Sequence, residues 1–404
     1  MSIVMIKLIK IFTLSVVGLL CACSSYENVG EKSPTKYTQA DYDYLAITDP
    51  KHMSLASKRA LARNYHKYEE WFGRFTVYNL GGDFAYEEGV IRRDPSRVLL
   101  INDMYYTWYT RSTGETKGFG TGDPEAKVFP WDKSEIWYAT SKDGWVWDEK
   151  GPAVVRGETG RYDDRSVFTP EILAHDGKYY LVYQAIKAPY NDRAKNTVGM
   201  AVAETPDGPW KVLDAPILTP AANGEWLGEE DNRFAVIKQG DFDSHKVHDP
   251  TLMFYKGQFY LYYKGERMGE RLTSGGREIR WGVAISDKPE GPYKKSRANP
   301  ITQSGHEICI WQHKHGMVMI STDDGPEAGT VQWSDDGINF DIRAYIAKTP
   351  DAMGLVDSLD SEAHPMAALE WGLSHEYIVA PDQPWWSGGN AIQRFEFNAV
   401  NVHD

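Results

Sequence analysis

Apolar and polar residues alternate along the chain in short runs that end at Gly-containing turns. The clearest case is residues 245–265, HKVHDPTLMFYKGQFYLYYKG, where an Asp-Pro step precedes an apolar run, a Lys-Gly turn and an aromatic run. In that aromatic run Phe259, Leu261 and Tyr263 alternate with Tyr260 and Tyr262. Alternation on both sides of a tight turn predicts a β-hairpin, with Asp249 where its first strand begins.

This hairpin pattern repeats along the chain. Similar hairpins begin at Asp94, Thr169 and Asp249, with a shorter one at His306, and each is followed by a second strand-turn element. These elements start at Ile136, Val198, Trp281 and Val331. Four copies of a four-stranded unit, with a weaker fifth copy that starts at His364 and closes with residues 75–89, predict an all-β, five-bladed β-propeller over residues 77–404. A β-sandwich of repeated hairpins is the alternative, but it does not explain why the same turn ends each unit.

The N-terminal residues follow a different pattern and divide into three parts. Residues 1–23 resemble a bacterial lipoprotein signal, with two lysines, an apolar run too short to span a bilayer and a lipobox that ends at Cys23, the expected lipidation site. An ordinary cleaved signal or a short membrane anchor is the alternative. Residues 24–45 are polar and contain Pro, Ser and Lys, which is typical of a tether. In residues 46–76 apolar positions recur every three or four residues, which predicts an N-terminal helical arm that packs on its own propeller or on a second subunit.

Composition narrows the range of functions. Of 404 residues, 42% are hydrophobic, which is typical of a globular protein, and 14 Trp and 24 Tyr supply flat faces that pack strands or stack on sugar rings. The net charge of -13 has no basic block, which argues against nucleic acid and against an anionic substrate that needs long-range steering. We therefore expect a neutral substrate and a cell-envelope lipoprotein, in the periplasm or on the outer membrane, that meets the membrane only through its lipid. After processing Cys309 is the sole cysteine, and we expect a buried, inert thiol.

Chemistry is expected where the inner strands of the blades meet the central channel. The residues there are Asp94, Thr169-Pro170-Glu171, His248-Asp249, His306-Glu307 and His364. Acidic residues at four of five such positions repel one another, and burial raises their pKa values, so one site can hold both a proton donor and a proton acceptor. That combination suits glycoside hydrolysis.

Structural readings of the same residues stay open. An Asp-Pro step is also a common turn opener, and the histidines could be metal ligands, hydrogen-bond partners or proton donors. No tight metal-ligand spacing is present, so we predict no cofactor and no catalytic metal, and leave open a structural cation near the propeller axis.

Four motifs then carry a resemblance to a known family. They are GVIRRDPSR, SVFTPEIL, KVHDPTL and SGHEICIW. Together they resemble glycoside hydrolase family 117, the 1,3-α-3,6-anhydro-L-galactosidases or neoagarobiose hydrolases of agar degradation, and the similarity extends over nearly the whole mature chain. The resemblance implies an exo-acting, inverting enzyme that releases 3,6-anhydro-L-galactose from the non-reducing end of neoagaro-oligosaccharides. It also implies a homodimer formed by exchange of the N-terminal arm.

The resemblance also implies roles for individual residues. Asp94 would be the general base and His306 the general acid, with Asp249 and Glu307 as further catalytic residues that tune protonation. The candidate substrate contacts are Thr169, Glu171, Gln184 and His248. Inversion requires the base and the acid to lie about 6.5 to 9.5 Å apart, because a water must fit between the base and the sugar.

Two other functions compete with this one. The first is a propeller glycosidase of the arabinan- or xylan-cleaving type, which the His306-Glu307 pair disfavours. The second is a surface lipoprotein that binds oligosaccharide without cleaving it, since a fold does not decide a function. The complete set of acids disfavours that reading, because a pure binder gains nothing from carboxylates that repel one another.

Overall fold

The computed structural model describes residues 71–399 except 272–278, 304, 323–324, 326, 347 and 358–363, together with 37, 39, 42, 47–54 and 57–58. The chain divides into two compact units, Met1–Lys67 with Val402–Asp404, and Tyr68–Asn401. No helix among the described residues is long and apolar enough to cross a membrane.

The first unit contains a short turn and the start of a helix. The 3-10 turn η2 (Pro50–His52) is capped by Asp49, whose carboxylate accepts a hydrogen bond from the Lys51 backbone N–H at 3.1 Å. Ser54 Oγ accepts from the Ser57 backbone N–H at 3.0 Å, the geometry of a helix N-cap. The predicted signal segment 1–23 with Cys23, nearly all of the tether 24–45, and residues 46, 55–56 and 59–70 of the arm lie outside the described residues.

The described residues do not support a helical arm over residues 46–76, and its predicted end is wrong. Residues 73–76, predicted as the end of the helical arm, are the beginning of strand β1 (Gly73–Asn79). Phe75 lies 5.6 Å from Phe395 and 5.0 Å from Phe397 between ring centroids, so its burial comes from a neighbouring strand. The three- and four-residue spacing of aromatic residues before Gly73 accounts for the wrong boundary.

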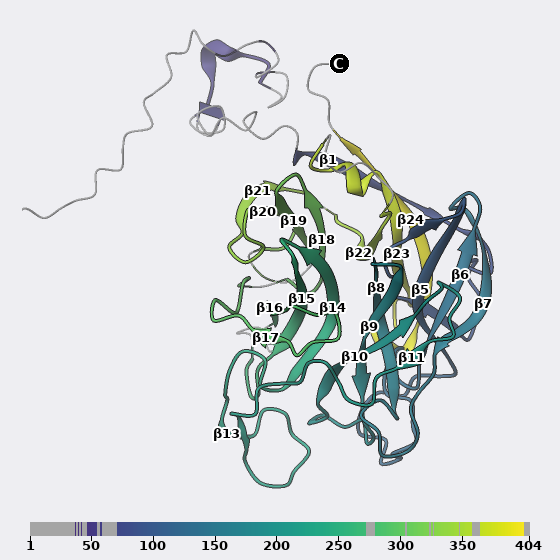
Figure 1. The fold of residues 1–404 in the computed structure, drawn as a ribbon. Coiled ribbons are helices and arrows are strands. Elements are labelled where there is room, and N and C mark those ends of the chain that lie inside the picture. Colours follow the sequence, from purple (N-terminus) through teal and green to yellow (C-terminus); the bar gives the residue numbers. More distant parts are fainter. Residues whose placement is uncertain are drawn as a thin grey trace, which may run out of the picture. The chain divides into compact units, whose positions relative to one another are not determined.

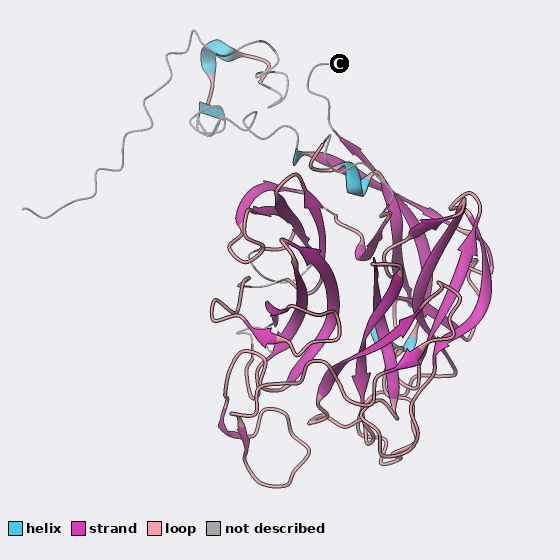
Figure 2. Ribbon diagram, viewed as in Figure 1, coloured by secondary structure: helices cyan, strands magenta, loops and turns pink. Residues whose placement is uncertain are grey.

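The second unit is a five-bladed β-propeller, in which the described residues form four four-stranded antiparallel blades and a first blade of six strands (Figure 1; Figure 2). In blade one, β3 (Val90–Arg93) and β4 (Leu99–Ile101) both pair with β5 (Met104–Thr113). The sheet continues with β6 (Glu135–Ser141) and β7 (Val146–Val154), and β2 (Gly81–Gly82) pairs with β7 in parallel. Blade two is β8 (Ser166–His175), β9 (Lys178–Ile186), β10 (Asn196–Ala203) and β11 (Lys211–Val212). Blade three is β14 (Lys246–Tyr255), β15 (Gln258–Glu266), β16 (Ile279–Ser286) and β17 (Lys294–Lys295). Blade four is β18 (Ile308–His313), β19 (Gly316–Ser321), β20 (Thr330–Ser334) and β21 (Asp341–Tyr345).

Blade five joins the two ends of the propeller. It consists of β22 (Asp351–Leu355), β23 (Trp371–Ile378), β24 (Gly389–Ala399) and β1, with Gly73 opposite Ala399. The predicted closure by an early segment is confirmed. The predicted start of this blade at His364 is wrong, because His364 lies in the turn before η4 (Ala367–Leu369) and the innermost strand begins at Asp351.

Smaller elements complete the propeller unit. They are a ribbon of β12 (Glu225–Trp226) and β13 (Val236–Lys238), and the 3-10 turn η5 (Trp385–Ser387).

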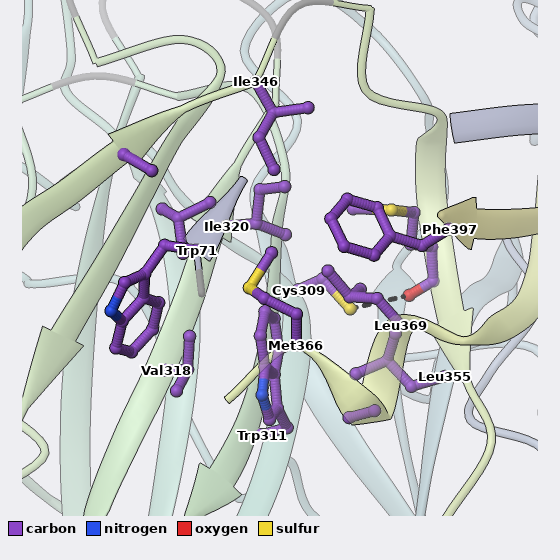
Figure 3. Packing of buried hydrophobic residues seen from close by; sticks show 14 of the residues in the cluster. Trp71, Cys309, Trp311, Val318, Ile320, Ile346, Leu355, Met366, Leu369 and Phe397 are labelled. Atoms are coloured by element: carbon purple, nitrogen blue, oxygen red, sulfur yellow. Dashed lines mark hydrogen bonds between the residues drawn. The ribbon is translucent and has the colours of Figure 1, made fainter. Parts of the chain in front are cut away.

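The core is distributed over the interfaces between blades. Five buried apolar clusters each join two neighbouring blades, and Figure 3 shows the one between blades four and five. The central strand β15 shows why its residues alternate: Phe259, Leu261 and Tyr263 pack toward blade two, whereas Tyr260 and Tyr262 pack toward blade four. A strand in a propeller is buried on both faces, so both sets are large and apolar or aromatic.

The turn between β14 and β15 has the predicted form. Lys256 and Gly257 both have positive φ, 49° and 78°, as a two-residue hairpin turn of the primed type requires. Cys309 is the free, buried cysteine expected, and its Sγ donates to the Met353 carbonyl at 3.2 Å.

Candidate active site

The innermost strands are interrupted at equivalent points. The pairing register shifts between Phe168 and Glu171, between His248 and Thr251, and between Asp351 and Gly354, and blade one breaks between β3 and β4. At these points four non-glycine residues have positive φ: Asp94 (50°), Thr169 (47°), Asp249 (49°) and Ala352 (48°). Such a conformation costs about 1–2 kcal/mol per residue, and backbone strain of this kind concentrates at functional sites.

The second strand of four blades supplies a polar side chain next to each interruption. Thr110 pairs with Arg93, Gln184 with Phe168, Lys264 with His248 and His375 with Asp351. Three of these side chains contact the acids expected in the site: Thr110 and His375 contact Asp94, and Lys264 contacts Asp249. The propeller therefore brings residues far apart in the sequence to one end of the channel.

Asp94 is buried among hydrogen-bond donors. Its Oδ2 accepts from Arg93 Nε at 2.9 Å and from the hydroxyls of Thr110 and Thr169, each at 3.2 Å. Burial by itself raises the pKa of Asp94, but the charge of the Arg93 guanidinium outweighs it and holds that pKa well below its usual range. Asp94 is therefore an ionised carboxylate at neutral pH.

Glu307, in contrast to Asp94, keeps its proton at neutral pH. Burial raises the pKa of Glu307 to about 8, and the negative charges of Asp351, Asp249 and Asp94 act in the same direction against the positive charge of Lys264. The Glu307 carboxyl accepts a hydrogen bond from the Ala352 backbone N–H. The site thus holds one ionised and one protonated carboxyl group, the condition for paired acid and base chemistry.

Asp249 and His248 lie on the bulge of β14. Asp249 is half-buried and forms an ion pair with Lys264 Nζ. The buried His248 ring lies between two carboxylates, with Nδ1 at 3.8 Å from Asp249 Oδ1 and Nε2 at 3.5 Å from Glu266 Oε1. His248 can therefore link the site to the buried charges around Glu266.

Gln184 and Thr169, two of the predicted substrate contacts, both lie in blade two, on β9 and β8. Gln184 is buried on β9, and its Oε1 has no hydrogen-bond partner among the described residues. A buried amide oxygen without a partner costs free energy, and a sugar hydroxyl can satisfy it. Thr169 bridges blades one and two, because its N–H donates to Thr110 Oγ1 at 2.7 Å while its own hydroxyl donates to Asp94.

Glu171 is held through one of its carboxylate oxygens. Its Oε1 accepts from the backbone N–H groups of Arg97 at 3.0 Å and Ile172 at 2.8 Å. These two bonds brace the carboxylate beside Arg97, and the role of Glu171 as a substrate contact stays a prediction.

Arg97 connects several blades near the axis. Its guanidinium donates to Asp357 Oδ1 at 3.0 Å, to Met253 Sδ at 3.2 Å and to the Ile310 carbonyl at 3.3 Å. Met253 and Ile310 lie on the innermost strands of blades three and four, so a positive charge of the protein itself lies close to the axis. Among the described residues, no group of three His, Cys, Asp or Glu side chains is arranged to hold a metal ion.

Sequence reasoning missed three residues of the site, Arg93, Lys264 and His375. His375 is buried on β23, and its Nδ1 accepts from the Asp94 backbone N–H at 3.2 Å. Burial lowers the pKa of His375, and nearby Arg93 lowers it further, so the ring is neutral and carries its proton on Nε2. The buried Nε2 has no partner among the described residues and is a donor available to a ligand.

Aromatic rings flank Arg93. Its guanidinium carbon lies 4.8 Å from the ring centroid of Trp131 and 5.2 Å from that of Tyr377, and Arg93 also donates to the Tyr377 hydroxyl at 3.1 Å. Trp131 is half-buried, and its ring also stacks on Phe129 with 4.8 Å between the centroids. His306 is also half-buried and directly precedes Glu307 at the entrance to blade four.

Known proteins share this architecture. A family model described as glycosyl hydrolases family 43 matches residues 90–226. Among solved structures, Zg3597, a family 117 glycoside hydrolase produced by the marine bacterium Zobellia galactanivorans, is 33% identical, with 83% of this chain and 93% of that protein covered and a TM-score of 0.66. The chain therefore belongs to glycoside hydrolase family 117.

More distant structures share the propeller alone with this family 117 member. A GH43 beta-xylosidase/alpha-arabinofuranosidase from a compost microbial metagenome, solved with xylotriose, is 14% identical, with 82% of this chain and 99% of that protein covered and a TM-score of 0.50. A further structure, described only as a glycoside hydrolase, is 17% identical, with coverages of 85% and 96% and a TM-score of 0.53. Among curated proteins, none matches this sequence.

Proposed function

We propose that this protein is an exo-acting, inverting hydrolase that cleaves the α-1,3 bond at the non-reducing end of neoagaro-oligosaccharides and releases 3,6-anhydro-L-galactose. Membership of family 117 supports the substrate class. The observation that carries the reaction type is the opposite protonation of two carboxyl groups in one site, Asp94 ionised and Glu307 protonated at neutral pH.

Asp94 acts as the base that takes a proton from the attacking water. Three donors converge on its Oδ2, from Arg93, Thr110 and Thr169, and fix the carboxylate. Its Oδ1, which lies 3.3 Å from His375 Nδ1, is the oxygen that takes the proton of the water. A base held in one orientation removes the proton without first having to reorganise.

The leaving oxygen receives its proton from the His306-Glu307 pair. The family resemblance assigns the transfer to His306, and an adjacent protonated Glu307 is a proton store for it. Direct donation by Glu307 is the alternative, and it is favoured by a pKa raised to about 8. Asp249, held by Lys264, tunes the protonation of Glu307, because its negative charge raises that pKa.

Binding of the terminal sugar falls to the polar side chains that the second strands provide. The Gln184 amide oxygen and the His375 Nε2–H are a buried acceptor and a buried donor without partners among the described residues. A neutral sugar with several hydroxyl groups can pair with both. The ionised carboxylates of the site disfavour an anionic unit at this position, with Asp94 the clearest case.

The experiment that tests the proposal is product analysis. The protein without residues 1–23 is incubated with neoagarobiose and neoagarotetraose, and the products are separated by chromatography, with Asp94→Asn as the matched inactive control. The expected result is release of 3,6-anhydro-L-galactose from the non-reducing end by the wild type alone. Absence of release, or equal release by both proteins, would contradict the proposal.

A second candidate function is cleavage of arabinan- or xylan-type oligosaccharides, which the family 43 match over residues 90–226 favours. Arabino- and xylo-oligosaccharides tested in the same assay separate the two. If no oligosaccharide is cleaved yet neoagarobiose binds, the protein is a binding protein.

Assembly and location are part of the proposal. We propose a lipoprotein of the cell envelope, lipidated at Cys23, and a homodimer that exchanges the N-terminal arm. Metabolic labelling with a palmitate analogue tests the first, with Cys23→Ala as control. Light scattering of the protein lacking residues 1–67, compared with the protein lacking only 1–23, tests the second, since an unchanged dimer would rule out exchange of the arm.

A further inference from the structure

A pocket of about 520 Å³ lies in blade three, where it is lined by the segment before β14 and by residues of β16 and β17. Its walls come from the segment just before β14, which includes Gly240, and from Arg267, which follows Lys264 by three residues. Four cationic side chains line it, and only two carboxylates, Asp241 and Asp243, lie among them. This local excess of positive charge stands out in a protein whose net charge is -13.

Two of the four cations are neutralised within the protein. Lys295 Nζ forms an ion pair with Asp243, which also accepts from the Tyr263 hydroxyl at 2.9 Å. Arg280 holds Glu270 through two hydrogen bonds of 2.9 Å each. These pairs form the wall of the pocket and leave little charge for a ligand.

The other two cations, Arg267 and Arg297, keep their charge for a ligand. Arg267 is half-buried, and its Nε donates to the Gly240 carbonyl at 2.7 Å, which fixes the plane of the guanidinium. Its two terminal nitrogens have no hydrogen-bond partner in the described part of the chain, and the exposed Arg297 has neither an ion pair nor a side-chain hydrogen bond there. A guanidinium fixed in this way presents two parallel N–H donors, the geometry that recognises a two-oxygen anionic group.

We propose that this pocket binds a sulfate ester or carboxylate group carried by an oligosaccharide whose neutral terminal sugar occupies the catalytic site. The inference rests on the proposed function, because it assigns the substrate's remote end. Arg267 follows Lys264 by three residues, just beyond the end of β15, so the pocket lies at the same end of blade three as Lys264 and Asp249. The catalytic carboxylates repel an anionic unit and the arginines attract one, so the two sites together fix which end of the oligosaccharide enters.

The first test measures anion binding without catalysis. Sodium sulfate, and sodium phosphate in parallel, are titrated by calorimetry at constant ionic strength into the wild type, into Arg267→Gln/Arg297→Gln, and into Arg74→Gln. Arg74 is an arginine on β1 in blade five, outside the pocket, and serves as the control. We expect saturable sulfate binding by the wild type and the control, and at least about tenfold weaker binding by the double variant, from the loss of charge-assisted hydrogen bonds. Absence of saturable binding by the wild type, or equal binding by all three proteins, would overturn the proposal.

The second test identifies the source of the anion. In an Asp94→Asn background, which slows turnover, binding of an agar-derived tetrasaccharide that carries one sulfate ester is compared with binding of the same tetrasaccharide without it. Tighter binding of the sulfated form that is lost in the double arginine variant supports the proposal that the anionic group is carried by an oligosaccharide. An equal affinity for both forms would overturn that proposal in favour of a free anion. The double variant should still hydrolyse neutral neoagarotetraose at the wild-type rate. If the proposed function is wrong, the wild type fails to hydrolyse neoagarotetraose; if only the anion site is wrong, hydrolysis is normal and the binding tests fail.

Discussion

Replacing Glu307 with Gln removes a single titratable group and little else. The Gln side chain has the same length, and its amide oxygen can still accept the hydrogen bond from the Ala352 backbone N–H. The variant therefore isolates the proton that Glu307 holds at neutral pH. Its effect on stability should depend on pH in a way that the pKa of Glu307 determines.

The magnitude follows from the two pKa values of this carboxyl group. The pKa is about 8 in the folded protein and 4.5 for an ordinary glutamate, so between these values the native state keeps a proton that the unfolded state has lost. The contribution of Glu307 is therefore most favourable below pH 4.5 and declines as the pH rises to 8, by about 1.4 kcal/mol per pH unit. Gln does not titrate, so the free energy of unfolding of the variant, relative to that of the wild type, should rise by about 3 kcal/mol between pH 4.5 and pH 7.

Other groups of the site do not obscure this window. The pKa of Asp94 is lowered, so its stabilising contribution is present above its ordinary value of 3.8 and is lost only at lower pH. The pKa of His375 is lowered as well, so this residue reduces the free energy of unfolding as the pH falls below 6.5. That reduction is the same in the variant and in the wild type. The difference between variant and wild type therefore reports on Glu307.

The assay is urea unfolding followed by tryptophan fluorescence at pH 5, 6, 7 and 8. Glu88→Gln, at an exposed position, is the matched control, and its difference from wild type should not change with pH. If the Glu307→Gln difference is equally flat from pH 5 to pH 8, the carboxyl group is ionised throughout, and Glu307 cannot be a proton store or a proton donor.

Three further predictions concern activity and the channel. The value of kcat/KM should fall above pH 8, because Glu307 loses its proton there. Protonation of Asp94 should cause no fall in kcat/KM on the acid side above pH 4. If the Glu307→Gln variant still loses activity above pH 8, that loss belongs to another group. Asp94→Asn should reduce turnover about 10²- to 10⁴-fold with an unchanged circular dichroism spectrum, and wild-type rates would remove Asp94 from the mechanism. Arg97→Met should lower the free energy of unfolding by about 3 kcal/mol, because the half-buried Glu171 carboxylate loses the guanidinium charge 3.8 Å away. Chemical denaturation of Arg97→Met and Arg97→Met/Glu171→Gln would show whether the second change restores part of the loss.

The sequence predicted the fold where each strand is continuous and reverses in a tight turn. The β14–β15 hairpin is the best case, since both faces of β15 are buried and the Lys256-Gly257 turn needs positive φ. The innermost strand of blade five was missed because β22 has only five residues, contains a bulge and is joined to β23 by residues 356–370 in place of a hairpin. A short strand with a long connection leaves no local pattern.

The site was predictable only for residues that lie in recognisable motifs. Asp94 and Asp249 precede prolines at the strand interruptions, and Glu307 follows His306 in a matching position. Lys264 and His375 come from the second strands, and what brings them to the acids is the pairing register between strands, which no local pattern records. Protonation was equally out of reach, because it depends on which charges the fold gathers around each carboxyl group.

Closure of the ring by β1 also sets an order of events during synthesis. Blade five takes its outer strand from residues 73–79 and its other three strands from residues 351–399, so the ring stays open until the last of these has left the ribosome. His375 lies on β23, and Asp94 therefore gains this neighbour only when nearly the whole polypeptide is available. A nascent polypeptide cannot carry the complete catalytic site, which confines activity to the finished protein.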